Sequence, residues 1–264
     1  SARSSVGTPL HINHLPAFTA NHTYTLAALY PYATQPDGEW AFQGDFRYTI
    51  PRGSLLGGKY GTGIRINYAH VRGLKNVGTD RLPLDAPEKD LYGTDGYSHP
   101  FFGMGQLYYS DLNVELSKKF SRTVSITFNY YNQIYNQQVV EGHAINNPLV
   151  YSNIFVLDGK FKLAPNYTLR TELQYLNSRQ AEGSWLFGLA ELSIAPKWMF
   201  SLSDQYNMTV TKQHYYMATV AYSAGNHRLQ LGYGRTRAGI NCSGGVCRYM
   251  PETKGIYLTY NGTF

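Results

Sequence analysis

Residues 123–135 read TVSITFNYYNQIY, and most of this stretch alternates between apolar and polar side chains. One set consists of Val124, Ile126, Phe128 and Tyr130, and the other of Ser125, Thr127, Asn129 and Tyr131. A period of two is the spacing of a β-strand, in which successive side chains point to opposite faces. The stretch therefore predicts a strand with one apolar face and one more polar face.

The same alternation recurs along the chain, for example in residues 39–50 and 255–264. It predicts about twelve strands, which are residues 22–32, 39–49, 62–72, 104–118, 122–137, 149–163, 167–178, 184–195, 197–210, 213–224, 227–238 and 254–264. Most of them have about ten residues or more, which is enough to cross a bilayer at a tilt and longer than strands of soluble sheets. Strand length therefore favours a membrane barrel over a sandwich.

Composition agrees with a membrane location. Of the 264 residues, 43% are hydrophobic and only 15% are charged, and 24 are Tyr, whereas soluble domains have about 25% charged residues. No apolar run reaches the roughly 18 residues of a membrane-spanning helix, so a membrane would be crossed by strands. The net charge of +6 is spread along the chain, with no basic run longer than Lys118-Lys119, so nucleic acid is not an expected partner.

The connections between the predicted strands sort by length. If the strand 254–264 ends at the periplasmic face, the external connections are residues 73–103, 138–148, 179–183, 211–212 and 239–253. The periplasmic ones are then tight turns at 119–121, 164–166, 196 and 224–226, as in outer-membrane barrels. The glycine-rich segment 50–61 is the exception, because it is long but falls on the periplasmic side. We expect it either to fold into the mouth or to reflect an error in the strand count upstream.

The predicted fold is therefore all-β, a closed antiparallel transmembrane β-barrel formed by residues 22–264. Residues 1–21 are expected to be an N-terminal segment that serves as a loop or plug. If the chain is complete, strand 22–32 must pair with strand 254–264, because an unpaired edge in lipid leaves backbone groups unsatisfied. The side chains of Ile256, Leu258 and Tyr260 should face lipid, with Phe264 at the periplasmic rim.

Two segments do not fit a simple alternation. Asp204 falls on the apolar face of strand 197–210, where a charge near the midplane costs about 2–4 kcal/mol, so a bulge near Ser203 is expected to turn it inward. Residues 184–194 are apolar on both faces, and we expect a plug or a partner protein to cover one of them.

The chain stops at Tyr260-Asn261-Gly262-Thr263-Phe264, an alternating strand with a terminal aromatic residue. This ending resembles the signal, here Tyr260 and Phe264, by which the barrel-assembly machinery recognises bacterial outer-membrane proteins. Residues 22–68, HTYTLAALYPYATQPDGEWAFQGDFRYTIPRGSLLGGKYGTGIRINY, and residues 111–123, DLNVELSKKFSRT, resemble an uncharacterised family of outer-membrane proteins from Bacteroidota. The resemblance implies an outer-membrane location, with lipid and lipopolysaccharide as surroundings. It brings no known activity, and because members are usually longer, it implies strands before Ser1 and about fourteen or more in the barrel.

The two cysteines, Cys242 and Cys247, flank Ser-Gly-Gly-Val in the expected external loop 239–253. An oxidising envelope favours a disulfide between them. Zinc usually needs four ligands, and no Cys or His cluster supplies the others, so no metal and no cofactor are expected.

Polar side chains dominate the expected inner face. The candidates for lining a pore are Asp45, Arg47, Arg65, Asp111, Glu115, Arg170, Glu172 and Arg228. Two readings stay open: these charges pair across the lumen and fill it, or they line a narrow path for a small neutral or zwitterionic solute. We expect porin-like passage as the function.

Two alternatives remain. The first is a non-conducting subunit of a larger envelope assembly, with aromatic residues in loop 73–103 (Tyr92, Tyr97, Phe101 and Phe102) as contacts. The second is an outer-membrane enzyme, which is not the expectation: the His-x-Ser-Asn-Gly stretch of outer-membrane phospholipases is absent, and Ser98-His99 and His143 near Glu141 lie in loops. No catalytic residue is therefore assigned.

Overall fold

A computed structural model describes residues 22–35, 38–74, 102–142, 145–243 and 246–263, and for residues 240–243 and 246–250 it describes the backbone only. Eleven strands form one antiparallel sheet. They are β1 (Glu39–Ile50), β2 (Thr62–Leu74), β3 (Met104–Lys119), β4 (Val124–Asn136), β5 (Leu149–Ala164), β6 (Tyr167–Asn177), β7 (Trp185–Ile194), β8 (Trp198–Asn207), β9 (His214–Ala224), β10 (His227–Thr236) and β13 (Thr253–Gly262). A short helix, α2 (Gln137–Glu141), and a hairpin of β11 (Gly239–Ser243) and β12 (Val246–Met250) complete the described elements.

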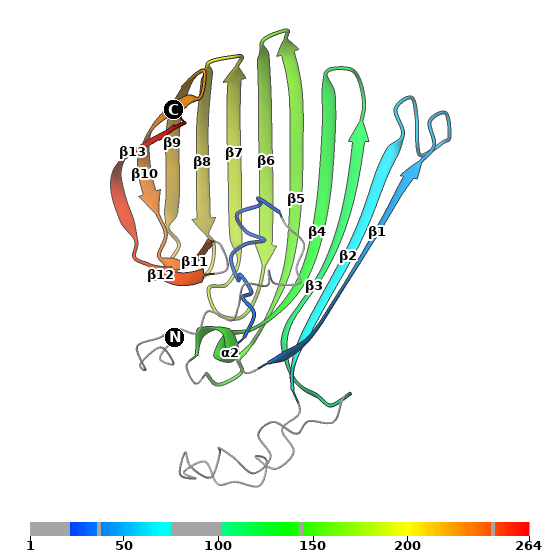
Figure 1. The fold of residues 1–264 in the computed structure, drawn as a ribbon, viewed down its shortest axis with the longest axis vertical. Coiled ribbons are helices and arrows are strands. Elements are labelled where there is room, and N and C mark those ends of the chain that lie inside the picture. The colour runs from blue at the N-terminus through cyan, green and yellow to red at the C-terminus, as the bar shows by residue number, and fades with distance from the viewer. Residues whose placement is uncertain (1–21, 36–37, 75–101, 143–144, 244–245, 264) are drawn as a thin grey trace.

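Each strand pairs with its neighbours in the chain, in the order β1 to β10 and then β13 (Figure 1). The alternation of apolar and polar side chains thus predicts these eleven strands with boundaries that differ by at most a few residues. Among the described residues, β1 pairs only with β2 and β13 only with β10. The sheet curves but is open, so the closed barrel expected from the sequence is not confirmed.

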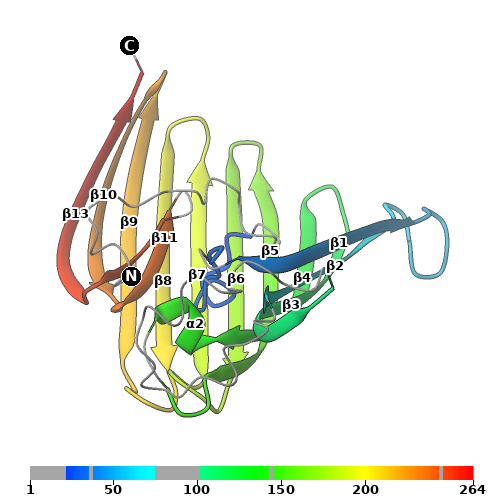
Figure 2. The same ribbon diagram turned by 60° about the horizontal axis from the view of Figure 1, so that its bottom comes forward.

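The prediction of a strand at residues 22–32 is wrong. These residues form turns, in which the amide of Ala28 donates to the carbonyl of Tyr24 at 3.1 Å and the amide of Leu29 to that of Leu26 at 3.2 Å. The segment lies inside the curve of the sheet and does not pair with β13 (Figures 1 and 2). Pro31 was the available signal, since proline disfavours the middle of a strand.

The connections sort into two ends, as expected. Short turns after β3, β5, β7 and β9 lie at one end, which we call the turn end, together with residues 51–61 (Figure 1). The opposite end, the loop end, carries α2 and the β11–β12 hairpin. The hairpin lies within residues 239–253, for which the sequence predicts an external loop without strands.

Residues 51–61 do not fold into the mouth. They close on themselves through Gly53 N to Gly58 O, at 2.7 Å, and are tied to β3 by Lys118 Nζ, which donates to the carbonyl of Leu56 at 3.0 Å. The side chain of Leu55 is 98% exposed. The segment is therefore a compact connection that extends beyond the turn end.

The convex face of the sheet is apolar. Large exposed side chains on it are Phe46, Ile66, Leu116, Leu157, Leu173, Leu186, Phe200, Leu202, Leu229, Leu231, Ile256 and Leu258. Outward aromatic residues stand near both ends of the strands: Tyr48, Tyr167, Trp198 and Tyr260 toward the turn end, and Tyr151, Tyr175 and Tyr233 toward the loop end. Ile256, Leu258 and Tyr260 share the apolar face, as predicted, and Phe264 lies outside the described residues.

Asp204 is an outward residue, and the bulge expected at Ser203 is absent, because the register of β8 with β7 and β9 runs unbroken through this position. The carboxylate lies 2.6 Å from Nδ1 of His214, the first residue of β9. Asp204 is near the loop end of β8 rather than at mid-strand. Its carboxylate can therefore pair with the exposed His214 without turning to the concave face.

No helix in the described part of the chain is both long and apolar enough to span a membrane.

Candidate functional site

The concave face of the sheet carries the densest cluster of polar and aromatic side chains, and residues 22–34, which we call the inner segment, pack against it. Leu26 has 0% exposure, and Ala27, Leu29 and Tyr30 are also buried. They share one cluster with Tyr131 and Tyr135 of β4, Val150, Ile154 and Val156 of β5, Leu176 of β6 and Trp185 and Phe187 of β7. The inner segment thus covers the inward apolar face of β7, for which the sequence predicts a plug or a partner protein.

Three amide side chains on the concave face of the sheet, which we call the wall, form hydrogen bonds with the inner segment. Two of these bonds are to its backbone and one is to a tyrosine hydroxyl. Gln174 of β6 accepts from the amide of Leu26 at 2.8 Å, and Gln133 of β4 donates to the carbonyl of Ala27 at 3.0 Å. Asn129 of β4 donates to the hydroxyl of Tyr24 at 3.1 Å. Because a buried backbone group without a partner costs about 1–3 kcal/mol, these bonds fix where the segment can sit.

Aromatic pairs add to the contact between the inner segment and the sheet. Tyr30 packs on Tyr135 with ring centroids 5.3 Å apart, and Tyr32 stacks on Tyr109 at 5.2 Å. Burial raises the pKa of the Tyr30 hydroxyl, and burial together with a hydrogen bond to Glu39 raises the pKa of Tyr32. Burial also raises the pKa of Tyr24 to about 12. These phenols are neutral at physiological pH and act as hydrogen-bonding groups, not as charges.

Two ion networks lie on the concave face. On β1 and β2, Asp45 binds the guanidinium groups of Arg47 and Arg65, each at 2.7 Å. On β5 and β6, Arg170 binds Asp158 at 3.0 Å and also Glu172. Every pair joins residues of one strand or of adjacent strands. These charges therefore pair along the concave face and not across a lumen, which was one of the two possibilities that the sequence left open.

The remaining pore candidates are also inward but are not brought together. Asp111 is 1% exposed and stands opposite Gln133 in the register of β3 and β4. Glu115 is the register partner of Arg65, whose guanidinium binds Asp45 instead. Arg228 lies at the turn end of β10, with Nη2 3.8 Å from the sulfur of Met199. The eight candidates therefore form separate groups and no single constriction.

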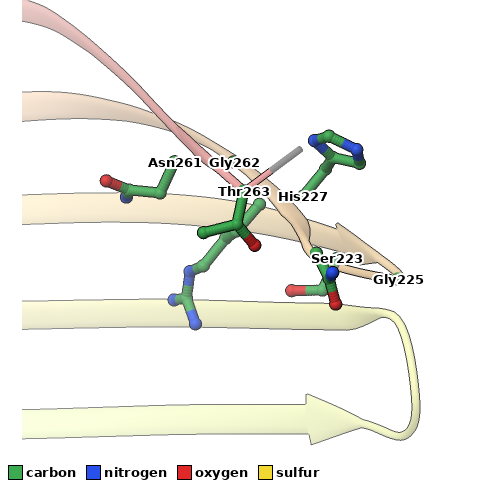
Figure 3. Close-up of a pocket in the computed structure, with 8 residues that line it drawn as sticks. Ser223, Gly225, His227, Asn261, Gly262 and Thr263 are labelled. Carbon is green, nitrogen blue, oxygen red and sulfur yellow. The ribbon is translucent and has the colours of Figure 1, made fainter.

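Two clefts open at the turn end. One, of about 410 Å³, lies where the β9–β10 turn meets the end of β13 and is lined by Arg228, Ser223 and Asn261 among others. Figure 3 shows Asn261 and Thr263 on one side of it and Ser223 and Gly225 on the other. The second cleft, of about 400 Å³, lies between β3, β4, β5 and β6 and is lined by basic and hydroxyl side chains.

Several expected features fall on residues about which little is described. Ser98, His99 and His143, and of the loop aromatics Tyr92, Tyr97 and Phe101, lie outside the described residues. Phe102 is described, and its ring stacks with Trp40 at 6.3 Å. Cys242 and Cys247 are backbone register partners in the β11–β12 hairpin, but their side chains are not described, so the disulfide stays a prediction.

The described residues contain no group of three His, Cys, Asp or Glu side chains placed to hold a metal ion. The site is thus built from amides, phenols and ion pairs.

The fold and the concave site define a class, that of an all-β protein made of one antiparallel meander around an inner segment of the same chain. Residues 1–264 match the model of a family of unknown function (DUF6029), and the chain belongs to that family. Its description names no location, so the resemblance to outer-membrane proteins of Bacteroidota stays an expectation. No curated protein matches the chain.

Proposed function

We propose that this chain forms the wall of a bacterial outer-membrane β-barrel whose interior is filled by its own inner segment. The observation that carries the proposal is the distribution of side chains on the sheet. The convex face carries large apolar side chains along the strands and aromatic side chains near both strand ends, whereas the charged and amide side chains lie mainly on the concave face. An apolar band between two aromatic girdles is typical of outer-membrane barrels.

Strand dimensions support the same proposal. The sheet strands have 10 to 16 residues, and about 9–11 tilted residues cross a bilayer. In water, a convex face of this kind would be an apolar patch far larger than monomeric soluble proteins expose. In lipid, the same face contributes favourable burial.

The proposal requires partners for the free edges of β1 and β13. In the hydrocarbon region no water can satisfy exposed backbone groups, so only closed sheets persist there. Strands beyond the eleven described, from this chain or from another, must pair with both edges. Alternatively, the two edges must pair with each other in the membrane.

The inner segment favours a non-conducting resting state. It fills the middle of the concave face, where Leu26, Tyr30 and Trp185 exclude water. A barrel in this state serves as a wall or as a subunit of an envelope assembly. Passage of small polar solutes is the second candidate, favoured by the ion networks on the concave face, and it requires that segment to move.

The test of the membrane location compares two adjacent positions of β10. Leu231 points outward at mid-strand and Gln230 points inward. In a lipid bilayer, Leu231→Arg should lower the free energy of unfolding by about 2–4 kcal/mol, while Gln230→Arg should lower it much less. Both are measured as the folded fraction in phosphatidylcholine vesicles across a urea series. A neutral Leu231→Arg beside a damaging Gln230→Arg would contradict the proposal.

A further inference from the structure

The second cleft at the turn end gathers positively charged side chains. Of the residues that line it, Lys119, Arg122, Lys160 and Lys162 are basic, and Thr123, Ser125 and Thr168 carry hydroxyls. No acidic residue lines it. A cleft of about 400 Å³ is large enough for a small ligand.

The strand register explains why these side chains converge. Lys119 of β3 is the partner of Ser125 of β4, and Ser125 is the partner of Lys160 of β5. The three residues form a row across the concave face, with neighbouring strands about 4.8 Å apart. Lys162 stands two residues further along β5, opposite Thr168 of β6. The ammonium groups therefore project from one face into one region.

The β3–β4 turn is held in place beside this row. Ser121 Oγ accepts from the amides of Thr123 and Val124 at 3.1 and 3.0 Å. The carbonyl of Thr123 accepts from the amide of Lys162 at 2.7 Å, which ties the turn to β5. Arg122 is thus presented at the rim of the cleft on a fixed backbone.

The nearest carboxylates along the register form no ion pair with the basic side chains of the cleft. Asp158 and Glu172 both bind Arg170, which is the partner of Lys160 on β6. Within the described part of the chain, no ion pair involves Lys119, Arg122, Lys160 or Lys162, although the ammonium of Lys119 lies 5.5 Å from the ring of Tyr60. Four cations in one cleft that has no acidic lining residue repel one another and favour a multivalent anion.

We propose that this cleft binds a phosphate-bearing anion. The guanidinium of Arg122 offers a fork of donors that matches two phosphate oxygens, and the lysines act as point charges. The hydroxyls of Ser125 and Thr168 donate to further oxygens. A phosphate on a soluble molecule and a phosphate in a lipid headgroup share this chemistry. The concave location favours the soluble source.

The experiment titrates the purified full chain in a zwitterionic detergent with inorganic pyrophosphate at 0.1 M salt, a concentration chosen so that loose surface attraction is screened to about 10 Å. We expect saturable binding with one ligand per chain. Lys160→Gln/Lys162→Gln should weaken it about tenfold or more, which corresponds to about 1.4 kcal/mol. Arg122→Gln, which changes only an exposed turn, should weaken it as well.

The matched control removes the same charge elsewhere. Lys197→Gln/Lys254→Gln alters two exposed lysines outside the cleft and should leave the affinity within about twofold. Equal losses in both double variants, or no saturable binding by the wild type, would overturn the proposal. Repeating the titration in phosphatidylcholine nanodiscs with and without phosphatidic acid identifies the source. Competition by phosphatidic acid assigns the site to lipid headgroups, and its absence to a soluble phosphate compound.

Discussion

At the scale of single residues, the inner segment depends on a few wall side chains whose roles can be separated. Gln174 is the clearest case, because its side-chain carbonyl oxygen accepts from the buried amide of Leu26 while its side-chain amide donates to Glu172. It links the backbone of the segment to the ion network of β6. Losing it should therefore loosen the segment without breaking the sheet.

We predict that Gln174→Leu destabilises the docked inner segment by about 1–3 kcal/mol, because the amide of Leu26 loses its only described acceptor in a dry site. The control is Leu173→Ala on the same strand, whose side chain points to the convex face. Limited proteolysis within residues 22–34, in phosphatidylcholine vesicles, measures the population of the released segment. Equal protease sensitivity of Gln174→Leu and wild type would contradict the prediction.

His22 makes the packing of the inner segment pH-dependent. Its ring lies 5.2 Å from that of Tyr131, and burial lowers its pKa from 6.5 to about 4. The folded state therefore resists protonation that the free segment accepts. The stability of docking is complete above pH 6.5 and falls as the pH drops from 6.5 toward 4, with a limit on the order of 3 kcal/mol.

We expect Trp185 to report this change. In a background of Trp40→Phe and Trp198→Phe it is the only tryptophan left, and it is 2% exposed within the cluster that contains the inner segment. Its emission should shift to longer wavelength between pH 6.5 and 4.5. In His22→Phe, which cannot be protonated, the shift should be absent. A shift of the same size in His22→Phe would assign the effect to another group.

At the scale of elements, the β11–β12 hairpin places Cys242 directly opposite Cys247. Cα atoms of directly opposed antiparallel residues are about 4.5–5.5 Å apart, which lies within the range that a disulfide can bridge. We predict that non-reducing digestion gives one peptide with both cysteines. Alkylation of both thiols in the oxidised native protein would rule the bond out.

The bond should matter little to the sheet. A ring of so few residues removes little entropy from the unfolded chain. Cys242→Ser/Cys247→Ser should therefore keep the midpoint of unfolding of the sheet within a few degrees, measured by circular dichroism, while the hairpin becomes more sensitive to protease. A large drop in the midpoint would show that the hairpin supports the wall.

The strands could be predicted from the sequence because a period of two is local information. Most of the eleven sheet strands carry their own alternation, and the turns after β3, β5, β7 and β9 are short. The role of residues 22–34 could not be predicted in this way. Leu26 and Tyr30 look like strand residues in isolation, and their partners Gln174 and Glu182 lie about 150 positions away in the sequence.

The candidate site was predicted in part. Alternation placed Asp45, Arg65 and Arg170 on the inward face, and the structure agrees. It could not say which charges pair, because that depends on the register of adjacent strands. The same register collects Lys119 and Lys160 into one cleft, although they are 41 positions apart.

At the scale of the whole molecule, the proposal of a filled barrel predicts that the protein conducts almost no ions in planar bilayers. The wild type should show little conductance, and deletion of residues 22–34 should open a path along the polar concave face. Arg65→Ala and Arg170→Ala, which remove wall charges, should change the ion preference of the opened form but not open the wild type. Steady conductance of the wild type would favour passage of small polar solutes.

The same preparation tests the subunit alternative. After mild detergent extraction from its native membrane, a barrel that completes itself should migrate as a lone monomer. A co-purifying protein that cross-links to β1 or β13 would instead assign the free edges to an assembly. Both edges are defined by the described pairing, so single cysteines placed there report directly on what lies beside them.

The meander order of the strands bears on how the chain reaches this structure. From β1 to β10 every sheet contact joins consecutive strands, and β13 then pairs with β10, so pairing can advance one strand at a time. Docking of the inner segment is different, since Leu26 and Gln174 are separated by 148 positions. Long-range contacts of this kind form slowly because chain entropy is lost before they contribute. The wall should therefore assemble first and fill last, leaving an intermediate that is transiently hollow.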